Sequence, residues 1–371
     1  MILEELTAFS NLYGSNEDLV LAGGGNTSAK DGNLMYIKAS GTQLATITAD
    51  GFVAMDRAKL AETLTKEYPA DDDAREAMVL ADLNNARMPD QGSKRPSVET
   101  VLHSLFEQRF VLHLHPSVVN GVTCSQQGRA AAEKLIKHPF IWVDACKPGY
   151  VLSKICADEL ARFKAENGCP CDLVFLANHG VFFASDTVEG LGKLLEEVLA
   201  SIRAAIVREP DFSTGAFDGE KAEKCFAAIR KLYGEDCVIT YEPSVEALRF
   251  AETPESAAIL MKPFSPDHLV YCKQFQAYGF CDGCLPGAVK RCLEEHGYMP
   301  KIIIISGCGF FAVDETAKGS QTAADLFNDA IKVAVYAESF GGAKPMSDAL
   351  SDFIANWEVE SYRSKKHEGE E

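Results

Sequence analysis

The stretch FVLHLHP, residues 110–116, predicts a short buried strand that stops at a proline. Alternate side chains of a strand point to the same face of a sheet, so His113 and His115 point one way and the neighbouring leucines the other. Two neutral imidazoles at one place supply the nitrogen ligands that suit Zn²⁺. Alternatively, the two histidines share no role, one being exposed and the other buried.

The segments around this strand alternate between helical and strand-like patterns, which predicts an α/β fold. Helical patterns cover residues 56–84, 97–109 and 117–137, and strands are expected at 33–39, 173–177 and 181–184. A long helix is expected to open at Asp186, whose side chain can cap the free amides, and to run to about Arg208.

The length of 371 residues predicts roughly two or three domains. Residues 209–222 are rich in turn formers and have no clear period, so we place a domain boundary there. The sequence thus predicts a first domain over 1–210, a smaller second α/β domain over 223–363, and a disordered charged tail over 364–371.

The composition argues against several classes of partner. Lys plus Arg number 36 and Asp plus Glu 54, so the formal net charge is −18 and no basic footprint for nucleic acid exists. No apolar run approaches the ~18 residues needed to cross a membrane. The first ten residues carry Glu4 and Glu5 and lack the basic start of a signal peptide. We therefore expect a cytoplasmic protein whose 12 cysteines are reduced thiols.

One segment of the second half of the chain is similar in sequence to a segment of the first half. Residues 302–312 resemble residues 173–183 when Gly309 is set on Gly180. Cys308 then stands where the first block has a histidine, and no His-x-His follows residue 200. The second half is either a shortened, degenerate copy of the first or a convergent strand–turn–strand–helix unit. As a copy, it is expected to serve packing or assembly.

A third histidine lies in the turn Asn178-His179-Gly180, between two apolar strands. His179 there offers a third metal ligand, and three histidines leave an open fourth position, as in catalytic zinc sites. The alternative is a hairpin turn with a histidine on the surface.

The segment Pro96-Ser97-Val98-Glu99 is expected to open the helix that precedes the His-x-His strand. Beside a metal, the Glu99 carboxylate is suited to act as a general base. The alternative is plain helix-start chemistry, because an acidic side chain in a first turn faces the positive end of the helix dipole. His103, one turn on, is either a supporting partner or a packed side chain.

Two turns offer contacts for an anion. Successive amides of the turn at residues 23–28 can form an anion nest, and Lys38-Ala39-Ser40-Gly41 at a strand end offers a second contact. Either is also explained by ordinary turn chemistry. The Cys281-x-x-Cys284 motif has no second pair to complete a four-thiolate zinc site, which favours incidental thiols over a redox role.

In order along the chain, the motifs are Gly-Gly-Asn-Thr-Ser (24–28), Ala-Ser-Gly (39–41), Pro-Ser-Val-Glu (96–99), His-Leu-His-Pro (113–116) and Asn-His-Gly (178–180). This ordered set resembles the class II aldolase/adducin family over roughly residues 15–205. The particular residues of these motifs are most similar to those in the aldolase part of bacterial bifunctional rhamnulose-1-phosphate aldolase/dehydrogenase proteins.

The resemblance implies an α/β/α sandwich around a central, mainly antiparallel sheet, with active sites between subunits of a homo-oligomer. By position, His113, His115 and His179 resemble the ligands of a divalent metal, usually Zn²⁺, and Glu99 resembles the catalytic acid/base. The residues that resemble the family's phosphate contacts are Asn26, Thr27, Ser40, Gly41 and Ser97. Val98 stands where fuculose-phosphate-type aldolases have a second serine.

The activity implied by the resemblance is reversible cleavage of a ketose 1-phosphate, of the rhamnulose or fuculose type, into dihydroxyacetone phosphate and an aldehyde through a metal-stabilised enediolate. The same chemistry serves pentose-phosphate 4-epimerases and keto-acid phosphate decarboxylases, which remain alternatives. A non-catalytic, adducin-like binding module is the alternative from another class, although such a module has no physical need for the histidines and Glu99.

Overall fold

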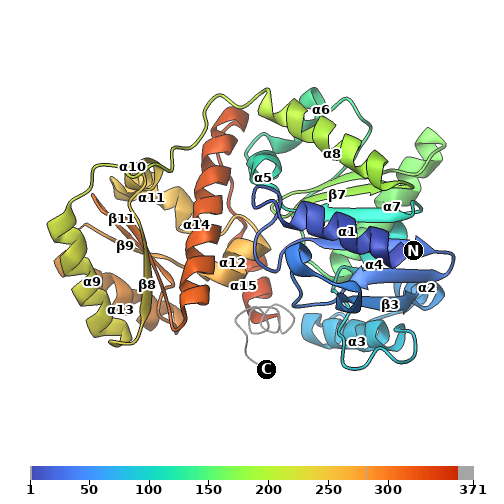
Figure 1. The fold of residues 1–371 in the computed structure, drawn as a ribbon, viewed down its shortest axis with the longest axis horizontal. Helices are drawn as coiled ribbons and strands as arrows, with labels where there is room; N and C mark the ends of the chain where they lie inside the picture. Colours follow the sequence, from blue (N-terminus) through green and yellow to red (C-terminus); the bar gives the residue numbers. More distant parts are fainter. Residues whose placement is uncertain (1, 281, 358–371) are drawn as a thin grey trace. The chain divides into compact units, whose positions relative to one another are not determined.

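A computed structural model describes residues 2–280 and 282–357, which form two compact units (Figure 1). The first unit comprises residues 2–119, 129–205 and 356–357, and the second comprises residues 120–128 and 206–355. Residues 120–128 belong to the second unit because their backbone bonds to its chain: Gln126 N–H donates to Gly342 O, and Lys344 N–H donates to Cys124 O. The tail expected at 364–371 lies outside the described residues.

The first unit is built on a seven-stranded sheet with the order β3-β2-β1-β4-β7-β6-β5. Every neighbouring pair is antiparallel except β5–β6, so the expected mainly antiparallel central sheet is confirmed. The strands are β1 (Asn26–Asp31), β2 (Leu34–Lys38), β3 (Phe52–Asp56), β4 (Phe110–Leu114), β5 (Ile141–Val143), β6 (Leu173–Leu176) and β7 (Gly180–Ser185).

Helices cover both faces of this sheet. On one face the ring of Phe9 in α1 packs edge-on against Phe110 of β4. On the other face Val111 of β4 lies in a core with Leu102 of α4 and Leu152 of α7. Because adjacent residues of β4 contact helices on opposite faces, the expected α/β/α sandwich is confirmed. The helices of this unit are α1 (Ile2–Gly14), α2 (Arg57–Thr65), α3 (Asp72–Asn85), α4 (Thr100–Leu105), α6 (Gly128–Leu135), α7 (Tyr150–Asn167) and α8 (Val188–Arg203). α5 (Ser117–Thr123) begins in this unit and ends in the second.

Several helix starts or lengths differ from the sequence prediction. The pattern at 117–137 is divided into α5 and α6. The pattern at 56–84 is divided into α2 and α3, and the pattern at 97–109 yields only α4, with Glu99 as its N-cap residue. The cap of α8 is Thr187, whose side chain accepts the N–H of Gly190, and not Asp186. The Asp186 carboxylate instead accepts the backbone N–H of Arg109, a tertiary contact that local sequence does not show.

The second unit has a four-stranded sheet with the order β8-β11-β10-β9, and only its β9–β10 pair is parallel. This region confirms the expected second, smaller α/β fold. Its strands are β8 (Val238–Glu242), β9 (Ala277–Gly279), β10 (Ile302–Ile305) and β11 (Gly309–Asp314). Its helices are α9 (Gly219–Tyr233), α10 (Val245–Ala251), α11 (Pro254–Ala257), α12 (Pro266–Cys272), α13 (Leu285–His296) and α14 (Ala317–Ala337), and α15 (Asp348–Asn356) follows.

None of the helices in the described residues combines the length and apolar character that crossing a bilayer requires. The Cys-x-x-Cys motif cannot be placed as a pair, because Cys281 lies outside the described residues.

Candidate metal and catalytic site

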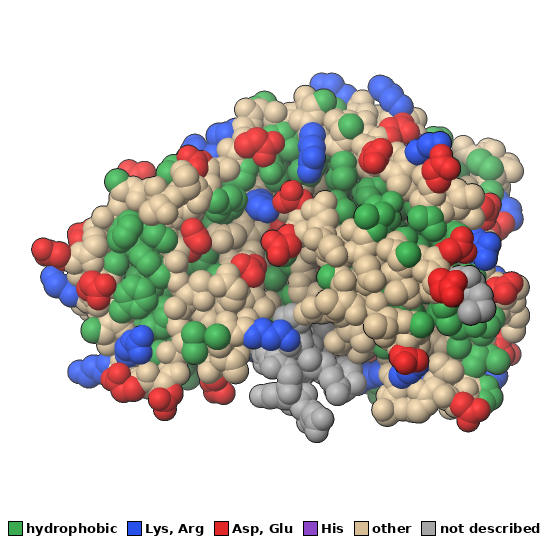
Figure 2. All heavy atoms as spheres, in the orientation of Figure 1, with side chains coloured by type: hydrophobic (Ala, Val, Ile, Leu, Met, Phe, Trp, Pro, Cys, Tyr) green, Lys and Arg blue, Asp and Glu red, His purple; other side chains and the backbone are tan. Residues whose placement is uncertain are grey.

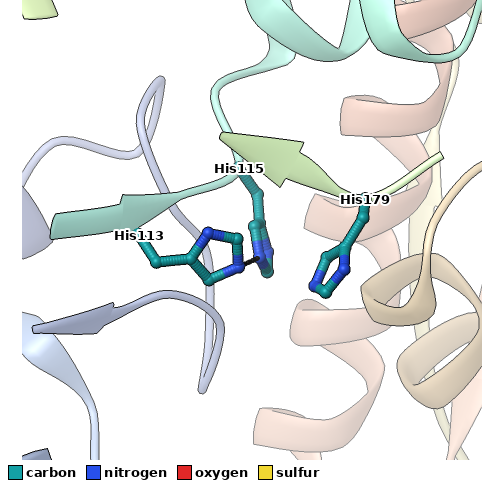
Figure 3. A group of neighbouring side chains, drawn as sticks. All are labelled: His113, His115 and His179. Carbon is teal, nitrogen blue, oxygen red and sulfur yellow. Dashed lines mark hydrogen bonds between the residues drawn. The ribbon is translucent and has the colours of Figure 1, made fainter. Parts of the chain in front are cut away.

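The three histidines expected to act together lie side by side in the first unit. His113 is in β4, His115 follows the end of that strand, and His179 lies in the turn that leads into β7 (Figure 3). One ligand nitrogen from each ring lies within 4.8 Å of the others. The antiparallel pairing of β4 with β7 produces this convergence, because it joins two segments that are far apart in the sequence.

The turn before β7 requires a glycine at position 180. Asn178 has a left-handed backbone, with φ of 55°, which asparagine tolerates better than most residues. A Cβ on Gly180 would lie 2.5 Å from the carbonyl oxygen of Leu114 and 2.6 Å from Cδ2 of His115. Glycine therefore lets the turn approach β4 closely enough for His179 to join the other two rings.

The surroundings of His113 fix the direction of its lone pair. Its Nδ1 lies 3.0 Å from the carbonyl oxygen of Val181, so Nδ1–H donates there and Nε2 is left as an acceptor. The ring of Phe182 stacks on His113 at a centroid distance of 4.0 Å and an angle of 12°. The Nε2 of His115 lies 2.9 Å from Nε2 of His113. Two imidazole nitrogens thus meet at one point, with the first ring held in place.

Glu99 directs a carboxylate oxygen at the same point. Its Oε1 lies 3.2 Å from Nε2 of His113 and 3.5 Å from Nε2 of His179, and it makes no hydrogen bond within the described residues. The imidazole nitrogens and Oε1 therefore converge on one point, and three imidazoles are a donor set that fits a divalent metal such as zinc.

The ionisation of Glu99 agrees with such a site. Burial raises the pKa of its carboxyl, but the imidazoles of His113 and His179 oppose that effect, and the net pKa lies well below the usual range. The side-chain amide of Asn26 donates to the other oxygen, Oε2. Glu99 is therefore an ionised, nearly buried carboxylate (8% exposed) that is held at one oxygen and open at the other.

His103 supports the site from the interior. Its Nδ1 lies 2.8 Å from the hydroxyl of Ser28, and burial lowers the pKa of its imidazole well below the usual range. The His103 ring also meets Phe182 edge-on, the ring that stacks on His113. Neither the bond to Ser28 nor the role of Phe182 was inferred from sequence, although Phe182 lies only two residues beyond Gly180.

The structure brings most of the expected phosphate contacts toward Glu99. Asn26 bonds to Glu99 directly, and the Ser97 hydroxyl accepts the Glu99 N–H at 3.2 Å. A bridge between Ala39 and Pro96 places the Ser40–Gly41 turn beside Ser97. Thr27 is different: it is fully buried, and its hydroxyl lies 2.7 Å from that of Ser10.

Lys38 joins the two turns that were expected to bind an anion. Its ammonium donates to the carbonyl oxygens of Gly23 (3.1 Å) and Thr42 (2.7 Å), and the side chain is buried. A buried cation thus lies between the glycine-rich turn and the Ser40–Gly41 turn, where it lowers the electrostatic cost of binding an anion.

A family model described as "Class II Aldolase and Adducin N-terminal domain" matches residues 4–206. The chain belongs to this family. The family resemblance seen in the ordered motifs is thereby confirmed, and the matched span includes all three histidines and Glu99.

One curated relative of this aldolase/adducin chain is a Bacillus subtilis (strain 168) protein named uncharacterized oxidoreductase YuxG. It is 24% identical over 97% of this chain, and the chain spans only 58% of that relative's length.

Solved structures with a similar fold include the N-terminal class II aldolase domain of a conserved Thermoplasma acidophilum protein. That domain is 25% identical in sequence, and the TM-score is 0.47. The match covers 55% of this chain and 93% of the Thermoplasma chain. Another is an L-fuculose-1-phosphate aldolase from Thermus thermophilus, which is 17% identical in sequence with a TM-score of 0.35. The match covers 54% of this chain and 92% of the aldolase chain.

Proposed function

We propose that this member of the class II aldolase and adducin family is a metal-dependent aldolase. It would cleave a ketose 1-phosphate of the rhamnulose or fuculose type into dihydroxyacetone phosphate and an aldehyde. The observation that carries this proposal is the cluster of three imidazoles, two of which lie within 3.5 Å of Oε1 of Glu99. Family membership supports an aldolase-type reaction.

His113, His115 and His179 are the proposed ligands, and Zn²⁺ is the ion that suits three neutral imidazoles with an open position. When bound, such an ion supplies Lewis-acid stabilisation of the negative charge that develops on the substrate's oxygens during carbon–carbon cleavage. Val181 and Phe182 keep the His113 ring oriented for this task, the first by accepting from Nδ1 and the second by stacking.

Glu99 is the proposed proton carrier. Cleavage leaves excess electron density on the carbon that becomes part of dihydroxyacetone phosphate, and that carbon must take up a proton. The amide of Asn26 holds Oε2, so Oε1 is the oxygen that exchanges a proton with the substrate. Burial excludes bulk water, which strengthens the electrostatic interactions within the site.

The Ser40–Gly41 turn and Ser97 are proposed to bind the phosphate, with the buried Lys38 nearby. A positive charge at this place allows an anionic substrate to bind to a chain with a formal charge of −18.

Elemental analysis of the purified protein is the first test. We expect about one zinc-like ion per chain, lost in the double variant His113→Ala/His115→Ala. His138→Ala is the matched control, because His138 pairs with Asp172 outside the cluster and should leave the metal content unchanged. A folded wild-type chain that takes up no stoichiometric metal, even from added zinc, overturns the proposal and favours a binding module.

The second test separates binding from chemistry. Glu99→Gln keeps the size of the side chain but cannot carry the proton, so cleavage of rhamnulose and fuculose phosphates should fall by about 10²-fold or more with metal still bound. Product analysis then identifies the reaction, since an epimerase returns an isomeric sugar phosphate and a decarboxylase releases CO₂. Full activity of metal-loaded Glu99→Gln rules out the proposed role of Glu99.

A further inference from the structure

A row of buried polar side chains lies on one face of β1 in the first unit. Alternate side chains of a strand point to opposite faces, and Thr27 points to the face of α1, where it meets Ser10. Asn26, Ser28 and Lys30 therefore point together to the other face, and they are 7%, 0% and 5% exposed. Charged side chains ordinarily lie on the surface, as the red and blue side chains scattered over the face drawn in Figure 2 show. A buried row of this kind requires partners.

Two members of the row bond to α4 and to the residue that caps it. The side-chain amide of Asn26 donates to Oε2 of Glu99, and the hydroxyl of Ser28 lies 2.8 Å from Nδ1 of His103. Glu99 and His103 are four residues apart, so they occupy one face of the helix on successive turns. Asn26 also lies directly beside His113 in the β1–β4 pairing. The two bonds thus join one face of α4 to the strand that adjoins the histidine cluster.

The bond between Ser28 and His103 is the one hydrogen bond of the imidazole within the described residues, because Nε2 is buried without a partner. Burial lowers the pKa of this imidazole well below the usual range, so the ring is neutral. Placing a neutral imidazole in the interior with one nitrogen unbonded costs free energy that an apolar side chain would not cost. The pair therefore contributes a defined direction more than it contributes stability.

The direction of α4 needs such a device. The helix has six residues, Thr100–Leu105, and is too short to be stable without tertiary contacts. Val101 and Leu102 pack into two apolar cores, but apolar contacts are not directional. A hydrogen bond is directional, so it fixes the rotation of a helix about its axis more closely. Glu99, at the N-cap, makes no capping bond with its side chain and moves with the helix.

We propose that Ser28 and His103 are positioning residues for Glu99. Their bond fixes the rotation of α4, so that Oε1 of Glu99 stays 3.2 Å from Nε2 of His113 and 3.5 Å from Nε2 of His179. This inference rests on the proposed role of Glu99 as the proton carrier. A misplacement of about 1 Å in an active site can cost about 10²-fold in rate, so a bond outside the histidine cluster controls the chemistry within it.

Two amide substitutions of His103 test the bond. In His103→Asn the amide takes the place of Nδ1 and Ser28 keeps a partner, whereas in His103→Gln the amide takes the place of Nε2 and Ser28 loses its partner. With metal bound, kcat for rhamnulose or fuculose phosphate should fall about tenfold or more in His103→Gln, and KM should change by less than about threefold. His103→Asn should recover most of this loss. Ser28→Ala, which keeps the ring and its packing, should lose as much as His103→Gln.

Lys30→Met is the matched control on the same face of β1. The Lys30 ammonium donates at 3.0 Å to the carbonyl oxygen of Gln108, which lies beyond the end of α4. Methionine is also unbranched but cannot donate this bond, so kcat should stay at the wild-type value whatever the change in unfolding temperature. Wild-type kcat in Ser28→Ala overturns the proposal. So does an equal loss of kcat in Lys30→Met and Ser28→Ala, or in His103→Asn and His103→Gln.

Crystal structures of wild type and Ser28→Ala give a measurement that does not depend on activity. In Ser28→Ala we expect Oε1 of Glu99 to move by about 1 Å or more from its place beside His113. An unmoved Glu99 overturns the proposal even if the protein is an active aldolase. A displaced Glu99 in a protein that cleaves no sugar phosphate supports the positioning role and refutes only the proposed reaction.

Discussion

Two parts of this molecule share one strand layout but differ in chemistry. β4-β7-β6-β5 in the first unit and β8-β11-β10-β9 in the second have the same order and the same pattern of antiparallel and parallel pairs. Gly180 faces Leu176 as Gly309 faces Ile305, so the hairpins also share their register. Strand order and register are thus compatible with either a metal site or its absence.

The difference lies in the side chains at matching positions. His113 pairs with Phe182 where Tyr241 pairs with Phe311. The stacking is retained: the ring centroids are 4.0 Å apart at 12° in the first unit and 4.6 Å apart at 19° in the second.

At the two remaining ligand positions, Pro243 corresponds to His115 and Cys308 to His179. The second unit therefore keeps the ring stacking of the first and lacks its three clustered histidines. Within the described residues, the metal-type cluster of three side chains occurs in the first unit only.

The largest effect is expected when the third ligand position is changed in each unit. His179→Ala should remove bound metal and the proposed cleavage activity, because two imidazoles hold zinc far more weakly than three. Cys308→Ala, the matched change, should leave metal content unchanged and cost only packing energy, about 1 kcal/mol. Metal analysis of both variants measures the bound metal per chain, and thermal unfolding measures the loss of stability. A loss of metal from Cys308→Ala contradicts the division of roles between the units.

A smaller effect is expected at the matching glycines. A Cβ on Gly180 would lie 2.6 Å from the His115 ring, whereas one on Gly309, with φ of 95°, would lie 2.3 Å from the carbonyl oxygen of Glu242. Both Gly→Ala variants should lose about 2–3 kcal/mol of unfolding free energy.

Only Gly180→Ala should also weaken metal binding, because only there does the added carbon displace a ligand. Denaturant unfolding of the metal-free proteins, followed by zinc titration, separates the two effects. Equal zinc affinity in Gly180→Ala and wild type is the contrary result.

The smallest effect is expected at the helix caps that follow the hairpins. Thr187 accepts the N–H of Gly190, and Thr316 accepts the N–H of Gly319, at 3.0 Å and 2.9 Å. Replacing either threonine with alanine should cost about 1 kcal/mol, measured by denaturant unfolding. The two losses should be similar, because the local geometry is the same. A clear inequality shows that one cap carries an additional tertiary role.

Much of the first unit could be predicted because its signals are local. The alternation in residues 110–116 identifies β4 and the shared face of His113 and His115, and the turn residues identify the β6–β7 hairpin. The helix starts were less predictable. Asp186 and Thr187 are both good caps by type, and the competing bond from Arg109 to Asp186, a contact across 77 positions, decides between them.

The sequence by itself determined the alternation of helices and strands and the residue types suited to a metal, because periodicity and motifs are properties of neighbouring residues. The ordered motifs also carried the family resemblance, and the mainly antiparallel sandwich was expected from that resemblance. Only the tertiary structure decided that Oε1 of Glu99 faces Nε2 of His113 and that the hydroxyl of Thr27 is bonded to that of Ser10. These features depend on pairings between distant segments, whose geometry is set by packing across the whole unit and not by any local pattern.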